Sequence, residues 1–141
     1  MLLTIEKILI LKSVEIFSSV PEEQLADLAM IVDAVEFDAG ETIIRKGELG
    51  TSMYIVADGK VRITDGTQEL GLLGSRTVFG ELAALDPEPR AATVEVVEDC
   101  TLLRLDGESL YDLMSGNKEV TRGIIQVLCR YTRTNLSLAT S

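Results

Sequence analysis

The stretch over residues 79–94 reads FGELAALDPEPRAATV and decides the fold. It interrupts a region of short strands, because Gly80–Leu85 predicts a turn of helix inside that region. Pro87 and Pro89 then force an extended exit, and Arg90 is expected to open the next strand. The stretch therefore predicts a helical insertion into a β-structure, with an arginine returning from its far side.

The residue types in this stretch suit a ligand that carries both a negative charge and a hydroxyl group. A helix start points free N–H groups and a positive dipole end at whatever lies before it. Gly80 lets a ligand approach the backbone, and Arg90 can hold a phosphate through two parallel N–H bonds. Glu81 can accept from a sugar hydroxyl, so the set suits half of a nucleotide. The spacing fits a surface ion pair between Glu81 and Arg90 equally well.

The surrounding residues, Val35–Leu105, read as short strands separated by glycine turns. Met53–Val56 and Val61–Thr64 flank Asp58–Gly59, which predicts a tight hairpin, and Asp65–Gly66 predicts a second turn. Further strands are expected over Ala92–Val97 and Thr101–Leu105. This spacing favours a small all-β roll or jelly roll.

Helical periodicity lies on both sides of the strands. Thr4–Val35 is expected to be helical, with an apolar stripe formed by Leu25, Leu28, Ala29 and Val32. Asp106 is expected to cap a helix, and a second helix follows to about Asn135. We therefore expect a mainly β fold in one domain over residues 1–141. Its predicted parts are N-terminal helices over 1–35, a β-roll over 36–105 and two C-terminal helices over 106–135.

Composition restricts the function. The formal net charge of −10 argues against nucleic acid as a partner, since binding it requires Lys and Arg, and against an anionic membrane surface. The chain has no histidine, which removes Ser-His and Cys-His catalysis, imidazole zinc sites and the metal site of a cupin enzyme. We expect neither an enzyme nor a metal.

The N-terminal uncharged run is too short to insert across a bilayer. Cys100 and Cys129 are expected to be reduced and buried in a cytoplasmic protein.

The pattern Phe-Gly-Glu-Leu-Ala, a loop and Pro-Arg-Ala-Ala-Thr-Val resembles the phosphate-binding cassette of cyclic-nucleotide-binding domains. These occur in regulatory subunits of cAMP-dependent protein kinase, bacterial catabolite activator proteins and gated channels. The resemblance covers nearly the whole chain and implies a double-stranded β-helix, that is, a jelly-roll-like β-roll. The other resembling segments are Leu11–Leu28, Gly40–Ile43, Tyr54–Val56 and Leu105–Asp106. Arg76 stands where the family often has a second glycine, and it is expected to be solvated or to add a positive group near the ligand.

The resemblance implies a role for each residue of the cassette. Arg90 pairs with the cyclic phosphate, and the N–H groups of Ala83 and Ala91 complete the anion site. Because a hydroxyl-bearing residue after the arginine favours guanine in the family, Ala91 favours cAMP over cGMP. The ribose side is formed by Glu81, which accepts from the 2′-hydroxyl, together with Gly80 and Leu82.

The last helix is expected to cover the base, as it does in the family. Its heptad-like seam is formed by Val120, Ile124, Val127 and Tyr131, and Ile125 and Leu128 widen the apolar face. Tyr131 is expected to stack on adenine and Asn135 to pair with its N6/N7 edge. Ile63 and Leu70 are expected to form the floor of the pocket. The same helix predicts a homodimer, although ordinary core packing fits the pattern equally well.

These expectations converge on a non-enzymatic regulatory module that binds a cyclic nucleotide and acts on an effector protein that the sequence does not name. The alternative is a structural or docking β-roll that no longer uses a nucleotide, but such a domain should have lost Glu81 or Arg90. A transcription regulator is not expected, because no DNA-binding unit fits after the last helix within 141 residues.

Overall fold

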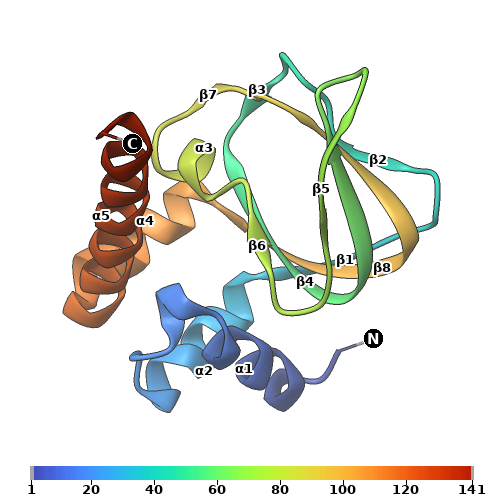
Figure 1. Cartoon of the computed structure of the whole chain (residues 1–141). Helices are drawn as coiled ribbons and strands as arrows, with labels where there is room; N and C mark the ends of the chain where they lie inside the picture. The colour runs from blue at the N-terminus through green and yellow to red at the C-terminus, as the bar shows by residue number, and fades with distance from the viewer. Residues whose placement is uncertain (1, 141) are drawn as a thin grey trace.

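Helices from both ends of the chain flank a rolled antiparallel sheet in the computed structural model (Figure 1). The structure describes residues 2–140, with side chains up to residue 134. The helices are α1 (Thr4–Ser13), the 3₁₀ helix η1 (Glu15–Phe17), α2 (Glu22–Ile31), α3 (Glu81–Leu85), α4 (Gly107–Gly116) and α5 (Lys118–Thr140). The strands are β1 (Asp33–Phe37), β2 (Thr42–Ile44), β3 (Leu49–Gly50), β4 (Ser52–Thr64), β5 (Glu69–Leu73), β6 (Val78–Phe79), β7 (Glu88–Pro89) and β8 (Thr93–Asp106). The predicted β-roll with flanking helices is confirmed.

The long strands β4 and β8 form the frame of the roll. They pair antiparallel from Ser52 opposite Asp106 to Thr64 opposite Thr93. Strands β1 and β2 also pair with β8, and β5 and β6 pair with β4. The short strands β3 and β7 form a separate two-stranded sheet.

Both faces of the frame are buried, because successive side chains of a strand point to opposite faces. On β4, Ile55 packs toward the helices and Val56 toward the interior of the roll. On β8, Leu103 packs toward the helices and Leu102 toward the interior of the roll. One hydrophobic core therefore joins the helices to the roll, and a second core fills the roll itself.

The predicted hairpin at Asp58–Gly59 is wrong, because β4 runs through these residues without a break. The pairing with β8 shifts register on both sides of Asp58, so the dipeptide forms a bulged corner rather than a turn. Gly59 has φ +107°, and a Cβ there would lie 2.5 Å from the Asp99 carbonyl oxygen and 2.7 Å from Cys100 Sγ. The strands expected over 92–97 and 101–105 are likewise one strand, which bends at the same corner.

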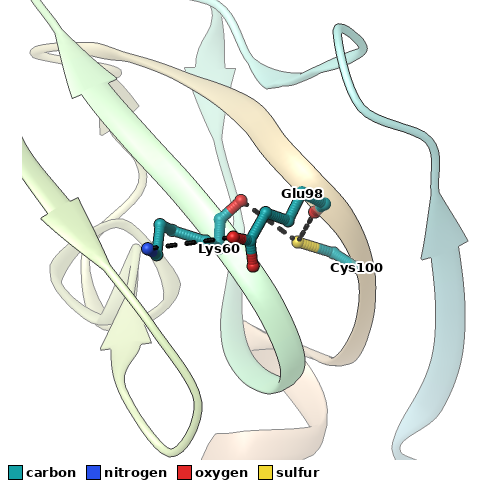
Figure 2. A network of polar contacts seen from close by, with 3 residues as sticks. All are labelled: Lys60, Glu98 and Cys100. Carbon is teal, nitrogen blue, oxygen red and sulfur yellow. Dashed lines mark hydrogen bonds and ion pairs between the residues drawn. The ribbon is translucent and has the colours of Figure 1, made fainter.

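Figure 2 shows the polar contacts at this corner. Cys100 Sγ lies 3.1 Å from the Glu98 carbonyl oxygen and 3.5 Å from that of Lys60, so the two oxygens share its single S–H donor. Burial raises the pKa of this thiol. Lys60 Nζ lies 3.9 Å from Glu98 Oε1 across the two strands. Cys129 is free like Cys100 but exposed, so the expectation that both cysteines are buried is wrong for Cys129.

The flanking helices largely follow the expected pattern. The stripe over Leu25–Val32 is buried, and Asp106 caps α4 by accepting from the Ser109 N–H at 2.8 Å. The helix expected to reach Val35 ends at Ile31 instead, because residues 33–37 pair with β8 as β1. Helix α5 continues to Thr140, beyond the expected end. Within residues 2–140, no helix is both long enough and apolar enough to cross a membrane.

Candidate functional site

Helix α3 begins at Glu81, one residue after the expected start, and Gly80 is its N-cap residue directly after β6. Phe79 stacks on Tyr54 of β4 with ring centroids 5.2 Å apart, which anchors the chain before the helix. Gly80 then adopts a left-handed conformation with φ +81°, a conformation that glycine adopts without steric cost. This reversal directs the first turn of α3 toward the space beside the roll. The first N–H groups of any helix have no intrahelical partner, so those of α3 can bind a group in that space.

A cavity of about 620 Å³ lies between α3, the start of β8 and the inner wall of the roll. Its walls are mainly apolar, and among the described residues that line it Arg90 is the one basic side chain. The expected site residues in its lining are Ile63, Gly80, Glu81, Leu82, Ala83, Arg90 and Ala91. The cavity therefore brings together all the residues expected to bind phosphate and ribose.

Arg90 lies between β7 and β8 with its guanidinium on backbone carbonyls. Its Nη2 donates to the Ser52 oxygen at 2.7 Å, and its Nη1 lies 3.5 Å from the Gly80 oxygen. In the described part of the chain its charge meets no carboxylate within ion-pair distance, so the surface pair with Glu81 does not form. Burial lowers the pKa of Arg90, with nearby Tyr54 opposing this, but a guanidinium stays charged. Arg90 precedes β8 rather than opening it, because β8 starts at Thr93.

Glu81, the expected ribose acceptor, also contacts the last helix. The Tyr131 hydroxyl of α5 donates to Glu81 Oε1 at 2.5 Å. Burial, and then this contact with a carboxylate, raise the pKa of Tyr131 above its usual range. One carboxylate can accept several hydrogen bonds, so Glu81 keeps capacity for a further hydroxyl.

The structure brings together fewer of the residues that were expected to bind the base. Ile63 lines the cavity, but Leu70 is 55% exposed and lies outside the lining. Gly71 is the residue that faces Ile63 across β4 and β5, and Leu70 lies where the pairing shifts register between Ile63 and Thr64, so it has no partner on β4. Tyr131, expected to stack on adenine, donates to Glu81 and is absent from the cavity lining. The Asn135 side chain lies outside the described residues.

The lining also contains apolar residues that were not among the expected binding residues: Ile44, Phe79, Leu85, Pro89, Ala92, Val94 and Leu128. Leu128 lies three residues before Tyr131 on α5, so the helix does reach the cavity, but at a different position. Ile44 and Val94 lie on the paired strands β2 and β8. Alternation along the cassette could have identified Val94, whereas no local signal identifies Ile44.

Arg76 lies away from this cavity. Its Nη1 donates to the Ser13 hydroxyl of α1 at 3.2 Å, and it is absent from the cavity lining. Its φ of +71° is the left-handed conformation that glycine favours. Among residues 2–140 we find no group of three or more acidic, cysteine or histidine side chains that could hold a metal ion.

Comparison with known proteins gives consistent matches to one kind of domain. A family model described as Cyclic nucleotide-binding domain matches residues 34–117. The chain is 32% identical over 136 residues to a CRP-like cAMP-activated global transcriptional regulator of Mycobacterium tuberculosis, covering 92% of this chain and 61% of the regulator. It is 33% identical over 107 residues to a cGMP-dependent protein kinase of Toxoplasma gondii, covering 76% of this chain and 11% of the kinase.

A solved structure agrees with these sequence matches. The catabolite activator protein of Thermus thermophilus superposes with a TM-score of 0.79 at 30% identity, covering 89% of this chain and 62% of that one. The chain spans less than two thirds of the length of each of these three proteins.

Proposed function

The chain belongs to the cyclic nucleotide-binding domain family, and from this we propose that it is a non-enzymatic regulatory module that binds cAMP in the cavity beside Arg90. The observation that carries the proposal is the guanidinium of Arg90, half-buried beside Gly80 and, among the described residues, within ion-pair distance of no carboxylate. The acidic residues of the lining, Glu81, Asp86 and Glu88, do not pair with it, so its positive charge is available to an anion. Glu81 at the start of α3 adds an acceptor for the ribose hydroxyl.

The choice of cAMP over cGMP rests on Ala91. Guanine-binding members of the family place a hydroxyl-bearing residue after the arginine, and Ala91 has no hydroxyl. The name of the Mycobacterium tuberculosis regulator includes cAMP, whereas that of the Toxoplasma gondii kinase includes cGMP. Ala91→Thr should therefore shift the ratio of the two dissociation constants toward cGMP.

Titration calorimetry with both nucleotides tests the proposal directly. Ligand at about 100 times its Kd should also raise the free energy of unfolding by roughly 2.7 kcal/mol. Absence of heat and of a thermal shift with either nucleotide at millimolar concentration would refute nucleotide binding and leave a docking β-roll. Tighter binding of cGMP than of cAMP would refute the role of Ala91 alone.

Helix α5 is proposed as the lid that covers the base and transmits the signal. Two contacts support this: Leu128 lines the cavity, and Tyr131 donates to Glu81. Helix α3 is also tied to α4, because the Tyr111 hydroxyl donates to the Leu85 carbonyl oxygen. A ligand that moves α3 therefore acts on both C-terminal helices, which Figure 1 shows beside it.

Hydrogen exchange tests the lid. Saturating cAMP should slow exchange of the backbone amides over residues 124–134, and unchanged exchange there would refute the lid.

The proposal also includes a homodimer through α5, supported by Ile125, which is 53% exposed on the helix. Sedimentation that shows a monomer at high protein concentration would refute the dimer. A cytoplasmic location, supported by the free thiols of Cys100 and Cys129, and an effector protein complete the proposal.

A further inference from the structure

Gly50 lies directly against the side chain of Arg90. A Cβ built on Gly50 would lie 2.6 Å from Arg90 Cδ and closer still to Nε and Cζ. Real Cβ atoms do not approach other heavy atoms so closely. The guanidinium therefore occupies the space that any side chain at position 50 would need.

Backbone conformation does not explain the glycine at this position. Gly50 is not among the glycines with positive φ, so an alanine could adopt the same backbone. Gly80, which also lies against Arg90, has φ +81° and needs to be glycine for that reason alone. At Gly50 the close approach of Arg90 is the specific requirement.

The two-stranded sheet holds the two residues together. Gly50 of β3 pairs with Glu88 of β7, two residues before Arg90. The Arg90 N–H donates to the Glu48 oxygen at 2.7 Å, and the Arg90 oxygen accepts from the Gly47 N–H at 2.8 Å. This ladder fixes the Arg90 backbone, and the bare surface of Gly50 then allows the side chain to lie flat toward the Ser52 carbonyl.

We propose that Gly50 is a positioning residue that seats the Arg90 guanidinium in the anion site, so that a side chain at position 50 displaces the guanidinium without disrupting the fold. The three nearest atoms to the built Cβ all belong to the Arg90 side chain. Because that side chain is flexible, it moves and the backbone stays. The effect on ligand binding rests on the proposed function, whereas the seating itself does not.

The seating is tested without ligand by Gly50→Ala, with Gly74→Ala as the matched control. Gly74 also lacks a positive φ, and a Cβ there would meet nothing within 4 Å. In NMR spectra, the Arg90 Nε–H resonance should shift in Gly50→Ala and stay in place in Gly74→Ala, while the backbone amides of β4 and β8 keep their wild-type pattern. An unmoved Nε–H resonance in Gly50→Ala would overturn the proposal, as would collapse of the β4 and β8 amide pattern.

Affinity measurements then test the consequence. Loss of a charge-assisted hydrogen bond should weaken cAMP binding at least about tenfold in Gly50→Ala. Adenosine, which has no phosphate, should bind both proteins equally, and Gly50→Ala should cause no further loss of cAMP affinity when Arg90→Ala is already present. Equal losses for cAMP and adenosine, or in both backgrounds, would overturn the proposal. If the wild type binds no cAMP, the proposed function fails, and the Nε–H resonance still decides whether Gly50 seats Arg90.

Discussion

Replacing Arg90 by alanine should remove most of the affinity for cAMP. Truncating one member of a buried, hydrogen-bonded charge pair costs about 2–5 kcal/mol, much of it because the partner charge is left unpaired. Arg90 is half-buried rather than enclosed, so the lower half of that range applies, about 2–3 kcal/mol. This corresponds to roughly a 30- to 150-fold rise in Kd.

The same variant should change stability much less than affinity. It removes one short bond to the Ser52 oxygen and one long bond to the Gly80 oxygen. A small polar recess beside Ser52 and Arg90 lets water replace these bonds, so the free energy of unfolding should fall by about 1 kcal/mol. Arg90→Lys should lie between alanine and wild type in affinity, because a lysine offers a point charge without the planar fork.

Calorimetry with cAMP and urea unfolding of each variant measure both effects. Arg104→Ala is the matched control: it also removes one positive charge, but Arg104 pairs with Asp33 at 3.3 Å and is absent from the cavity lining. Its cAMP affinity should equal that of the wild type. If Arg90→Ala binds as tightly as Arg104→Ala, the phosphate is held elsewhere and our assignment of the anion site is wrong.

Three further variants test other contacts. Tyr131→Phe removes the hydroxyl that donates to Glu81. Because Tyr131 is 41% exposed, this variant should lower the free energy of unfolding, measured in urea, by only about 1 kcal/mol. An unchanged free energy would show that the contact is not made in solution. The Asp65 carboxylate accepts from Gln68 and Thr67, which lowers its pKa to about 2 from the usual 3.8. The stabilising effect of the ionised Asp65 is therefore complete above pH 3.8 and is lost as the pH falls through about 2. The difference in Tm between wild type and Asp65→Asn should disappear over that pH range. A difference that persists below pH 2 would contradict this. Gly59→Ala should lower the Tm far more than Gly66→Ala, because both have positive φ but only Gly59 is packed against another strand; equal effects would show that packing at the corner is unimportant.

Local signals in the sequence predicted the parts of the fold that depend on a few neighbouring residues. Glu81–Leu85 forms the inserted helix with Gly80 as its N-cap, Asp65–Gly66 forms a turn and Asp106 caps α4. Asp58–Gly59 misled because the same dipeptide suits a hairpin and a bulge. The choice between them is made by pairing with β8, some 40 residues further on, which no local pattern contains.

The site divides in the same way. The residues expected to bind phosphate and ribose lie in one continuous segment, so a single motif predicted that they would meet in one cavity. The wall proposed to face the base is assembled from β2, β4, β8 and α5, and there a prediction that is wrong by one residue places a side chain outside the cavity. Leu70 is one residue from Gly71, which faces Ile63, and Leu128 rather than Tyr131 lines the cavity.

The position of β8 in the sheet has a consequence for how the chain is made. This strand pairs with β1, β2 and β4, yet among the strands of residues 2–140 it is the last to be synthesised. Asp33 accepts a hydrogen bond from Arg104, which lies 71 residues later in the chain. The sheet therefore cannot close before Arg104 has been synthesised. Until then β4 has one unpaired edge, because β5 and β6 pair with its other edge, and an unpaired edge is a template for association with other chains. Biogenesis of this protein should therefore be most sensitive to translational pausing and to chaperones in the interval before residue 106 emerges, and nonsense or frameshift products that end there should aggregate rather than fold.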